Sequence, residues 1–186
     1  MTRLAKFSFA IVILISSLIS AQKLSSFDVT GNFNFDDSEY LRWSELRINQ
    51  PIYNGIIDSV KSKIAKNILL QGYYFFKFNR DSLVISSDSS TFKIILDIDE
   101  GNPVVVRNIF FEGIDSTEIP NILSQFEYLK GQIFNKQEIE RNIQQLLSRF
   151  ENSGYPFAKI KINSVNVYRD TLTEDNYADI HLNIIS

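Results

Sequence analysis

Few residues in this chain could perform catalysis. Its 186 residues contain no Cys and a single His, His181. These counts exclude a Cys–His nucleophile pair and the usual Cys/His zinc site, because both need thiolates or several imidazoles. His181 falls on the polar side of the last expected strand, which favours an exposed strand residue. We therefore expect no enzymatic reaction, no metal site and no cofactor.

Carboxylates are the second group that could do chemistry. Asp97, Asp99 and Glu100 lie close together and could hold a metal ion or act as acid and base. The favoured interpretation is a solvated strand face followed by a turn. Asp36 and Asp37 are better interpreted as a helix cap. The seven Gly residues include no Gly-rich phosphate loop.

An internal repeat is the most informative feature of the sequence. Gly31 matches Gly113 at an offset of 82 residues, and the segment 72–78 matches 154–160 at the same offset. A later segment, 92–99, matches 178–185 at an offset of 86, with the extra residues in a hairpin. A period of this length exceeds that of a solenoid repeat and indicates a small domain that is used twice.

The first copy is expected to read β-α-α-β-β. Asp36, Asp37 or Ser38 can cap a first helix that ends near Leu46, and Pro51 breaks the chain. Apolar residues at helical spacing predict a second helix that Gly72 ends. The expected elements are a strand at 27–31, helices at 36–46 and 56–71, strand segments at 74–79 and 83–86, and a strand at 92–99.

The second copy is expected to repeat this order. Asn135 or Lys136 begins its long helix and Gly154 ends it, and residues 158–162 alternate between apolar and basic. Residues 169–175 form a polar turn. The other expected elements are a strand at 104–112, a helix near 118–126 and a last strand at 177–185.

These elements predict an α+β chain of two tandem domains. Each domain has a three-stranded mixed sheet with two helices on one face. The long helical crossover places the third strand parallel to the first, and the second strand remains on an edge. The expected boundaries are a linker at 22–26, a first domain at 27–103 and a second domain at 104–186.

Residues 1–21 have the layout of a secretory signal peptide. Arg3 and Lys6 precede an apolar run that is shorter than a membrane-spanning helix, and small residues precede Gln22. Cleavage would remove these two positive charges and change the net charge from −3 to −5. This balance argues against nucleic acid or anionic lipid as the main partner. The alternative interpretation is a retained anchor helix.

Aromatic and basic residues cluster after each long helix. If they form the second strand of each domain, they lie on an edge whose free N–H and C=O groups an extended polypeptide could join. The alternative is core packing with scattered exposed Phe residues, and the Lys residues could discourage uncontrolled edge pairing. The candidate peptide-binding residues are Phe75, Lys77, Phe78, Phe157, Lys159 and Lys161.

The order of the elements, the Gly-Tyr pair after each long helix and the junction Asp99-Glu100-Gly101-Asn102-Pro103 resemble POTRA domains. These are periplasmic repeats of outer-membrane assembly and transport proteins of the BamA/TamA-like group. The resemblance covers residues 27–186. It implies a periplasmic polypeptide-binding and docking module for the assembly or insertion of β-barrel proteins, with a hinge at the junction. Its implied partners are unfolded outer-membrane or secreted polypeptides and components of the assembly machinery.

The sequence is compatible with several interpretations of the whole protein. In the family, such repeats precede a membrane β-barrel, whereas this sequence ends at Ser186, where the next Glu-Gly junction is expected. The chain is then either the N-terminal part of a larger barrel protein, which would connect it to the outer membrane, or a stand-alone repeat protein. A two-partner-type polypeptide secretion transporter and a membrane-anchored division-type scaffold are alternatives. An unrelated periplasmic enzyme is disfavoured because a catalytic constellation is lacking.

Overall fold

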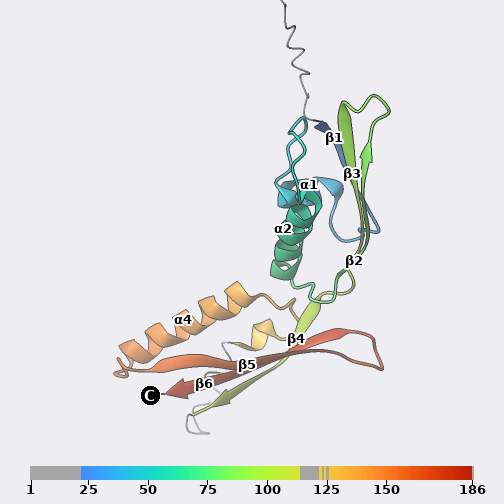
Figure 1. Cartoon of the computed structure of the whole chain (residues 1–186). Coiled ribbons are helices and arrows are strands. Elements are labelled where there is room, and N and C mark those ends of the chain that lie inside the picture. The colour runs from blue at the N-terminus through green and yellow to red at the C-terminus, as the bar shows by residue number, and fades with distance from the viewer. Residues whose placement is uncertain (1–21, 114–121, 123, 125, 186) are drawn as a thin grey trace, which may run out of the picture.

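The computed structural model describes residues 22–113, 122, 124 and 126–185, and within them the chain forms two α+β domains (Figure 1). The predicted signal peptide at 1–21 lies outside the described residues. Most of the helix predicted near 118–126 does as well. In the described part, no helix is both long and apolar enough to cross a membrane.

The first domain has the predicted β-α-α-β-β order. Asp36 caps the first helix, since its side chain accepts a hydrogen bond from the Glu39 amide at 3.0 Å. The second helix buries one face through Ile56, Val60, Ile64 and Ile68. The elements are β1 (Lys23–Thr30), α1 (Asp37–Ser44), α2 (Ile56–Leu70), β2 (Lys77–Ile85) and β3 (Thr91–Asp99).

The second domain follows the same plan in its described part. Asn135 caps the long helix by accepting a hydrogen bond from the Glu138 amide at 3.1 Å. A short 3-10 turn precedes it. The elements are β4 (Val104–Glu112), η1 (Glu127–Leu129), α4 (Lys136–Asn152), β5 (Lys159–Arg169) and β6 (Asn176–Ile185).

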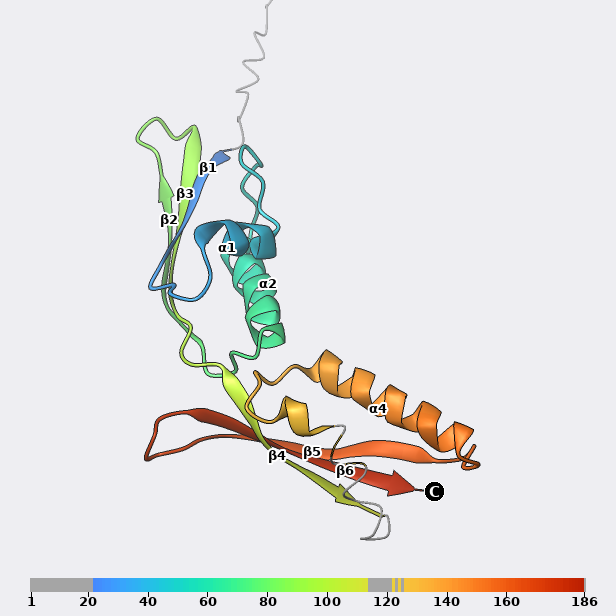
Figure 2. The ribbon, with the colours of Figure 1, turned by 180° about the vertical axis from the view of Figure 1, so that it is seen from behind.

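Each domain contains a three-stranded mixed sheet, as predicted. The strand orders are β1-β3-β2 and β4-β6-β5. The first and third strands of each domain pair in parallel, and the second and third pair antiparallel. Both views show α1 and α2 on one face of the first sheet and α4 along the second (Figures 1 and 2). The second strand of each domain therefore lies on an edge.

The repeated glycines have a common structural reason. Gly31 and Gly113 follow the first strand of their domains with φ of 78° and 83°. A Cβ at these positions would collide with the carbonyl oxygen of Ile98 or Ile184, at matching places in the third strands. The close approach of the backbones requires glycine, which also adopts a positive φ readily. The sequence repeat thus records a repeated packing constraint.

Two boundaries differ from the predictions. β1 begins at Lys23, where it pairs with Thr91, so residues 23–26 belong to the first sheet rather than to a linker. Residues 74–76 lie before β2, which then runs without interruption to Ile85. Gly72, at a φ of 88°, begins a turn after α2, and the chain becomes extended only at Lys77.

Candidate functional site

The structure places the predicted edge residues in two different settings. Lys77 and Phe78 lie in β2, and Lys159 and Lys161 lie in β5, on the edges where the sequence put them. The other two candidates, Phe75 and Phe157, lie outside the strands in the turns that precede them. Placing both on the edge strands was wrong, because the chain must first turn after the helix.

The side chains of these candidates also differ in exposure. Phe157 is 87% exposed and Phe75 38% exposed. Phe78 packs against the core of the first domain and meets Phe76 edge to face, with ring centroids 5.4 Å apart. Lys61 on α2 lies over the Phe78 ring, 5.3 Å from its centroid. Phe78 is thus a packing residue rather than a free anchor.

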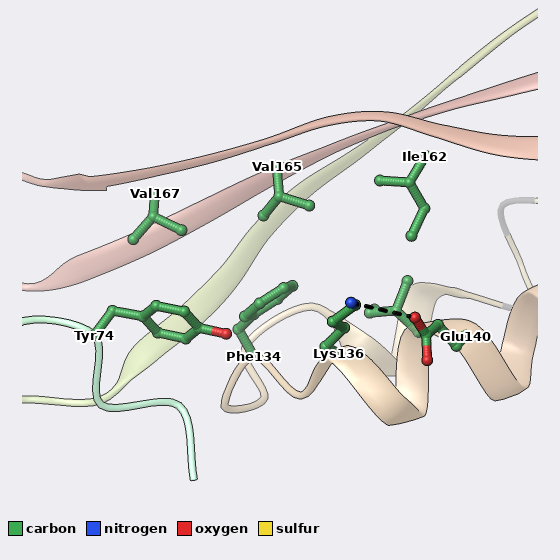
Figure 3. A pocket seen from close by; sticks show the side chains of 8 residues that line it. Tyr74, Phe134, Lys136, Glu140, Ile162, Val165 and Val167 are labelled. Atoms are coloured by element: carbon green, nitrogen blue, oxygen red, sulfur yellow. Dashed lines mark ion pairs between the residues drawn. The ribbon is translucent and has the colours of Figure 1, made fainter. Parts of the chain in front are cut away.

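An apolar groove lies beside the edge strand of the second domain. It has a volume of about 490 Å³ between β5 and α4. Figure 3 shows the β5 side chains opposite the start of α4, with an aromatic side chain from the first domain at one end. The lining residues are Tyr74, Phe134, Lys136, Ile139, Glu140, Ile162, Val165 and Val167.

A β-bulge arranges the strand side of this groove. The register of β5 against β6 shifts between Ile162 and Ser164. The extra residue returns Val165 to the same face as Ile162, and normal alternation adds Val167. The alternation over 158–162 predicted Ile162 as one of its apolar positions, but the two Val residues were not identified, because the bulge breaks the simple alternation that would have revealed them.

The helix side of the groove combines apolar and charged residues. Ile139 faces the core one turn into α4. Lys136 and Glu140 form an i,i+4 ion pair with an Nζ–Oε1 distance of 3.6 Å, and both are largely exposed. Such a pair stabilises the protein little and can rearrange when a ligand arrives.

A matching hollow exists in the first domain. It has a volume of about 440 Å³ and is lined in part by Ile52, Asn54, Ile57 and Leu83. At the repeat offset of 82, these residues correspond to Phe134, Lys136, Ile139 and Val165. The groove is therefore a property of the repeated fold rather than of one domain.

The two grooves nevertheless differ along the edge strand. In the first domain, Lys61 on α2 reaches Asp81 on β2, with an Nζ–Oδ2 distance of 2.6 Å. The residue of α4 that corresponds to Lys61 is Ile143, which is buried in the core. A charged contact therefore joins helix and edge strand in the first domain, and apolar packing replaces it in the second.

Glu100 corrects the prediction of a solvated turn. This side chain is only 2% exposed, and its carboxylate accepts hydrogen bonds from the loop between β1 and α1. The Asn34 amide donates at 2.6 Å and its side chain at 2.8 Å, the Phe33 amide at 3.1 Å and the Phe35 amide at 3.3 Å. The buried Tyr40 hydroxyl donates at 2.6 Å. Glu100 thus holds the loop against the end of β3.

The protonation states in this cluster follow from burial and hydrogen bonding. Burial opposes ionisation of Glu100, but the bonds from Tyr40 and Asn34 outweigh it and hold the pKa of Glu100 below its ordinary value. Burial and the bond to Glu100 both raise the pKa of the Tyr40 hydroxyl. The carboxylate is therefore charged and the hydroxyl protonated at neutral pH, a structural arrangement.

The remaining candidates for chemistry are structural or isolated. His181 is half-buried rather than exposed, and its ring stacks on Phe110 with centroids 4.7 Å apart. Among the described residues, no group of three or more His, Cys, Asp or Glu side chains could hold a metal ion. Asp97 and Asp99 do not join Glu100 in its hydrogen-bond network.

Comparison with protein families identifies the class of protein. The POTRA family, described as "Surface antigen variable number repeat", matches residues 22–101 and 104–185. Because these two matches cover most of the sequence, the chain belongs to the POTRA family and contains two tandem copies of its domain. No curated protein sequence matches the chain.

Among three similar solved structures, one matches the fold with a TM-score above 0.5. POTRA3-5 of Haemophilus influenzae BamA matches with a TM-score of 0.53 and 16% identity, covering 88% of this chain and 66% of that one. BamA from Haemophilus ducreyi lacking POTRA domains 1-3 matches with a TM-score of 0.48 and 19% identity, covering 88% and 29%. CdiB from Escherichia coli matches with a TM-score of 0.40 and 16% identity, covering 92% and 29%. The chain thus spans less than two thirds of each of these structures.

Proposed function

We propose that this chain is a periplasmic polypeptide-binding and docking module that acts in the assembly or insertion of outer-membrane β-barrel proteins, as part of a larger assembly or transport protein. It binds clients without catalysing a reaction. Family membership supports the general role, because POTRA domains are the periplasmic repeats of such proteins. The groove beside β5 supports the binding role and is the observation that carries it.

This groove suits an extended client strand. The free edge of β5 offers backbone N–H and C=O groups, and the adjacent groove accepts alternate side chains of an incoming strand. Ile162, Val165 and Val167 provide an apolar wall for them. Backbone pairing gives affinity with little demand on sequence, which suits a protein that handles many clients.

Exposed lysines lie on the other face of the same edge strand. Lys159 and Lys161 lie on β5 before the bulge, and both are exposed. A client strand with acidic residues opposite them would gain favourable cross-strand pairs. Without such a client, the charges discourage two copies of the edge from pairing with each other.

Titration of residues 22–186 with a synthetic peptide of alternating apolar and acidic residues tests this proposal. We expect weak binding, with amide NMR shifts along β5 and the start of α4. Val165→Asp should weaken binding by roughly tenfold, since it places a charge in an apolar wall. Leu83→Asp, at the matching position of the first domain, is the control and should leave the β5 shifts unchanged. Amide shifts confined to other surfaces, with none along β5, would refute edge binding.

A further inference from the structure

The β5 groove is not built by one domain alone. Tyr74 belongs to the first domain, in the turn after α2, yet its side chain packs against the core of the second domain. Its ring centroid lies 5.7 Å from that of Phe134. In Figure 3 the Tyr74 ring lies opposite Val167, at one end of the row of side chains that line the groove.

The backbone around Tyr74 is held against the second domain. The Val104 amide donates a hydrogen bond to the Gly72 carbonyl at 2.8 Å. A Cβ on Gly72 would collide with a methyl group of Ile133, so the missing side chain permits this approach. The repeated glycine, Gly154, has a similar φ but open space at its Cβ position. Gly72 therefore serves the contact between the domains as well as the end of the helix.

Tyr74 also lines two cavities. Its ring lines the β5 groove and, in addition, a cavity of about 510 Å³ between α2 and the start of α4. Leu69 and Leu70 of α2 line that second cavity and are partly exposed. Tyr74 thus contributes both to a groove of the second domain and to a cavity that is lined by both domains.

We propose that Tyr74 makes the β5 groove a two-domain site, so that a strand bound in the groove is coupled to the angle between the domains. This inference rests on the proposed function. A client touches Tyr74 only when the first domain is docked, and this contact favours the docked orientation over others. By reciprocity, the docked orientation binds the client more tightly.

Distance measurements between the domains test this coupling in the protein that comprises residues 22–186. The sequence contains no Cys, so Asp58→Cys on α2 and Ser148→Cys on α4 provide two exposed sites for spin labels. Saturation with the peptide of alternating apolar and acidic residues should narrow the distribution of distances between them. Tyr74→Ala should weaken binding by roughly three- to tenfold, the contribution of one aromatic contact. It should also abolish the narrowing.

Two matched variants separate the role of the ring from general damage. Tyr74→Phe keeps the ring and should keep the coupling. Phe33→Ala removes an exposed aromatic side chain of the first domain, which does not line the groove, and should change neither binding nor coupling. A wild-type distribution that stays unchanged when NMR shows a saturated groove would overturn the inference and leave the proposed function standing. If the peptide still narrows the distance distribution in Tyr74→Ala, the inference is likewise overturned and the proposed function stands. If the peptide causes no amide shifts along β5, both the proposed function and the inference are refuted.

Discussion

Replacement of Glu100 should destabilise the first domain more than any nearby acidic substitution. The Glu100 carboxylate accepts hydrogen bonds from the backbone of Phe33, Asn34 and Phe35 and from the Tyr40 hydroxyl. Glu100→Ala leaves these donors without an acceptor. Tyr40 is 0% exposed, so water cannot replace the lost partner without a change in structure.

The size of the effect follows from these contacts. A buried donor left unsatisfied costs about 1–3 kcal/mol, and the amides near the surface recover part of their loss through water. We expect Glu100→Ala to lower the free energy of unfolding by about 3–5 kcal/mol, a large part of the stability of a small domain. Glu100→Gln keeps one acceptor oxygen and should cost about 1–3 kcal/mol.

Tryptophan fluorescence reports this domain selectively. The sequence contains one Trp, Trp43, which is buried in α1 against Phe35 and Tyr40. Urea unfolding followed through Trp43 should show a midpoint lowered by about 1–3 M for Glu100→Gln, given a slope of about 1 kcal/mol/M. Asp99→Ala, an exposed neighbour, is the matched control and should shift the midpoint far less. Equal shifts for Glu100 and Asp99 variants would refute the assignment of Glu100 as the acceptor that holds the loop.

Two further predictions concern the same framework. Gly154→Val should cost about 1–2 kcal/mol because of its positive φ alone, and Gly72→Val should cost more because its side chain also meets the second domain; equal losses in thermal melts would contradict this. Because the folded pKa of Glu100 is depressed, its stabilisation is present above its unfolded pKa near 4.5 and is lost as the pH falls through the folded value. The free energy of unfolding of the wild-type first domain, followed through Trp43 fluorescence, should therefore fall with acid below about pH 4.5. Part of this loss comes from Glu100 and should be missing in Glu100→Gln; identical acid profiles would contradict the linkage.

Much of the fold could be predicted from local patterns. The helical spacing of apolar residues located α2 and α4, and alternation located β3 and β6. Gly72 and Gly154 marked the helix ends, where a positive φ is a local requirement that glycine satisfies most readily. The topology followed because a long helical crossover leads to a parallel pair and a hairpin to an antiparallel one.

The candidate site was predicted only in outline. The sequence indicated the edge strands, because strand order follows from the connections between elements. It misplaced Phe75 and Phe157, because the turn after each helix uses residues that have the composition of a strand. The bulge near Ile162 could not be predicted from the sequence, because an inserted residue shifts the alternation without changing the composition of the strand.

The sequence by itself determined the tandem repeat and the order of elements, because each depends on residue identity and local spacing. Only the tertiary structure decided the roles of Glu100 and Tyr74. Glu100 binds a loop that lies more than sixty residues earlier in the chain, and Tyr74 packs against the core of the domain to which it does not belong. Both roles depend on distances between segments that are remote in the chain, and no local pattern of side chains encodes such distances.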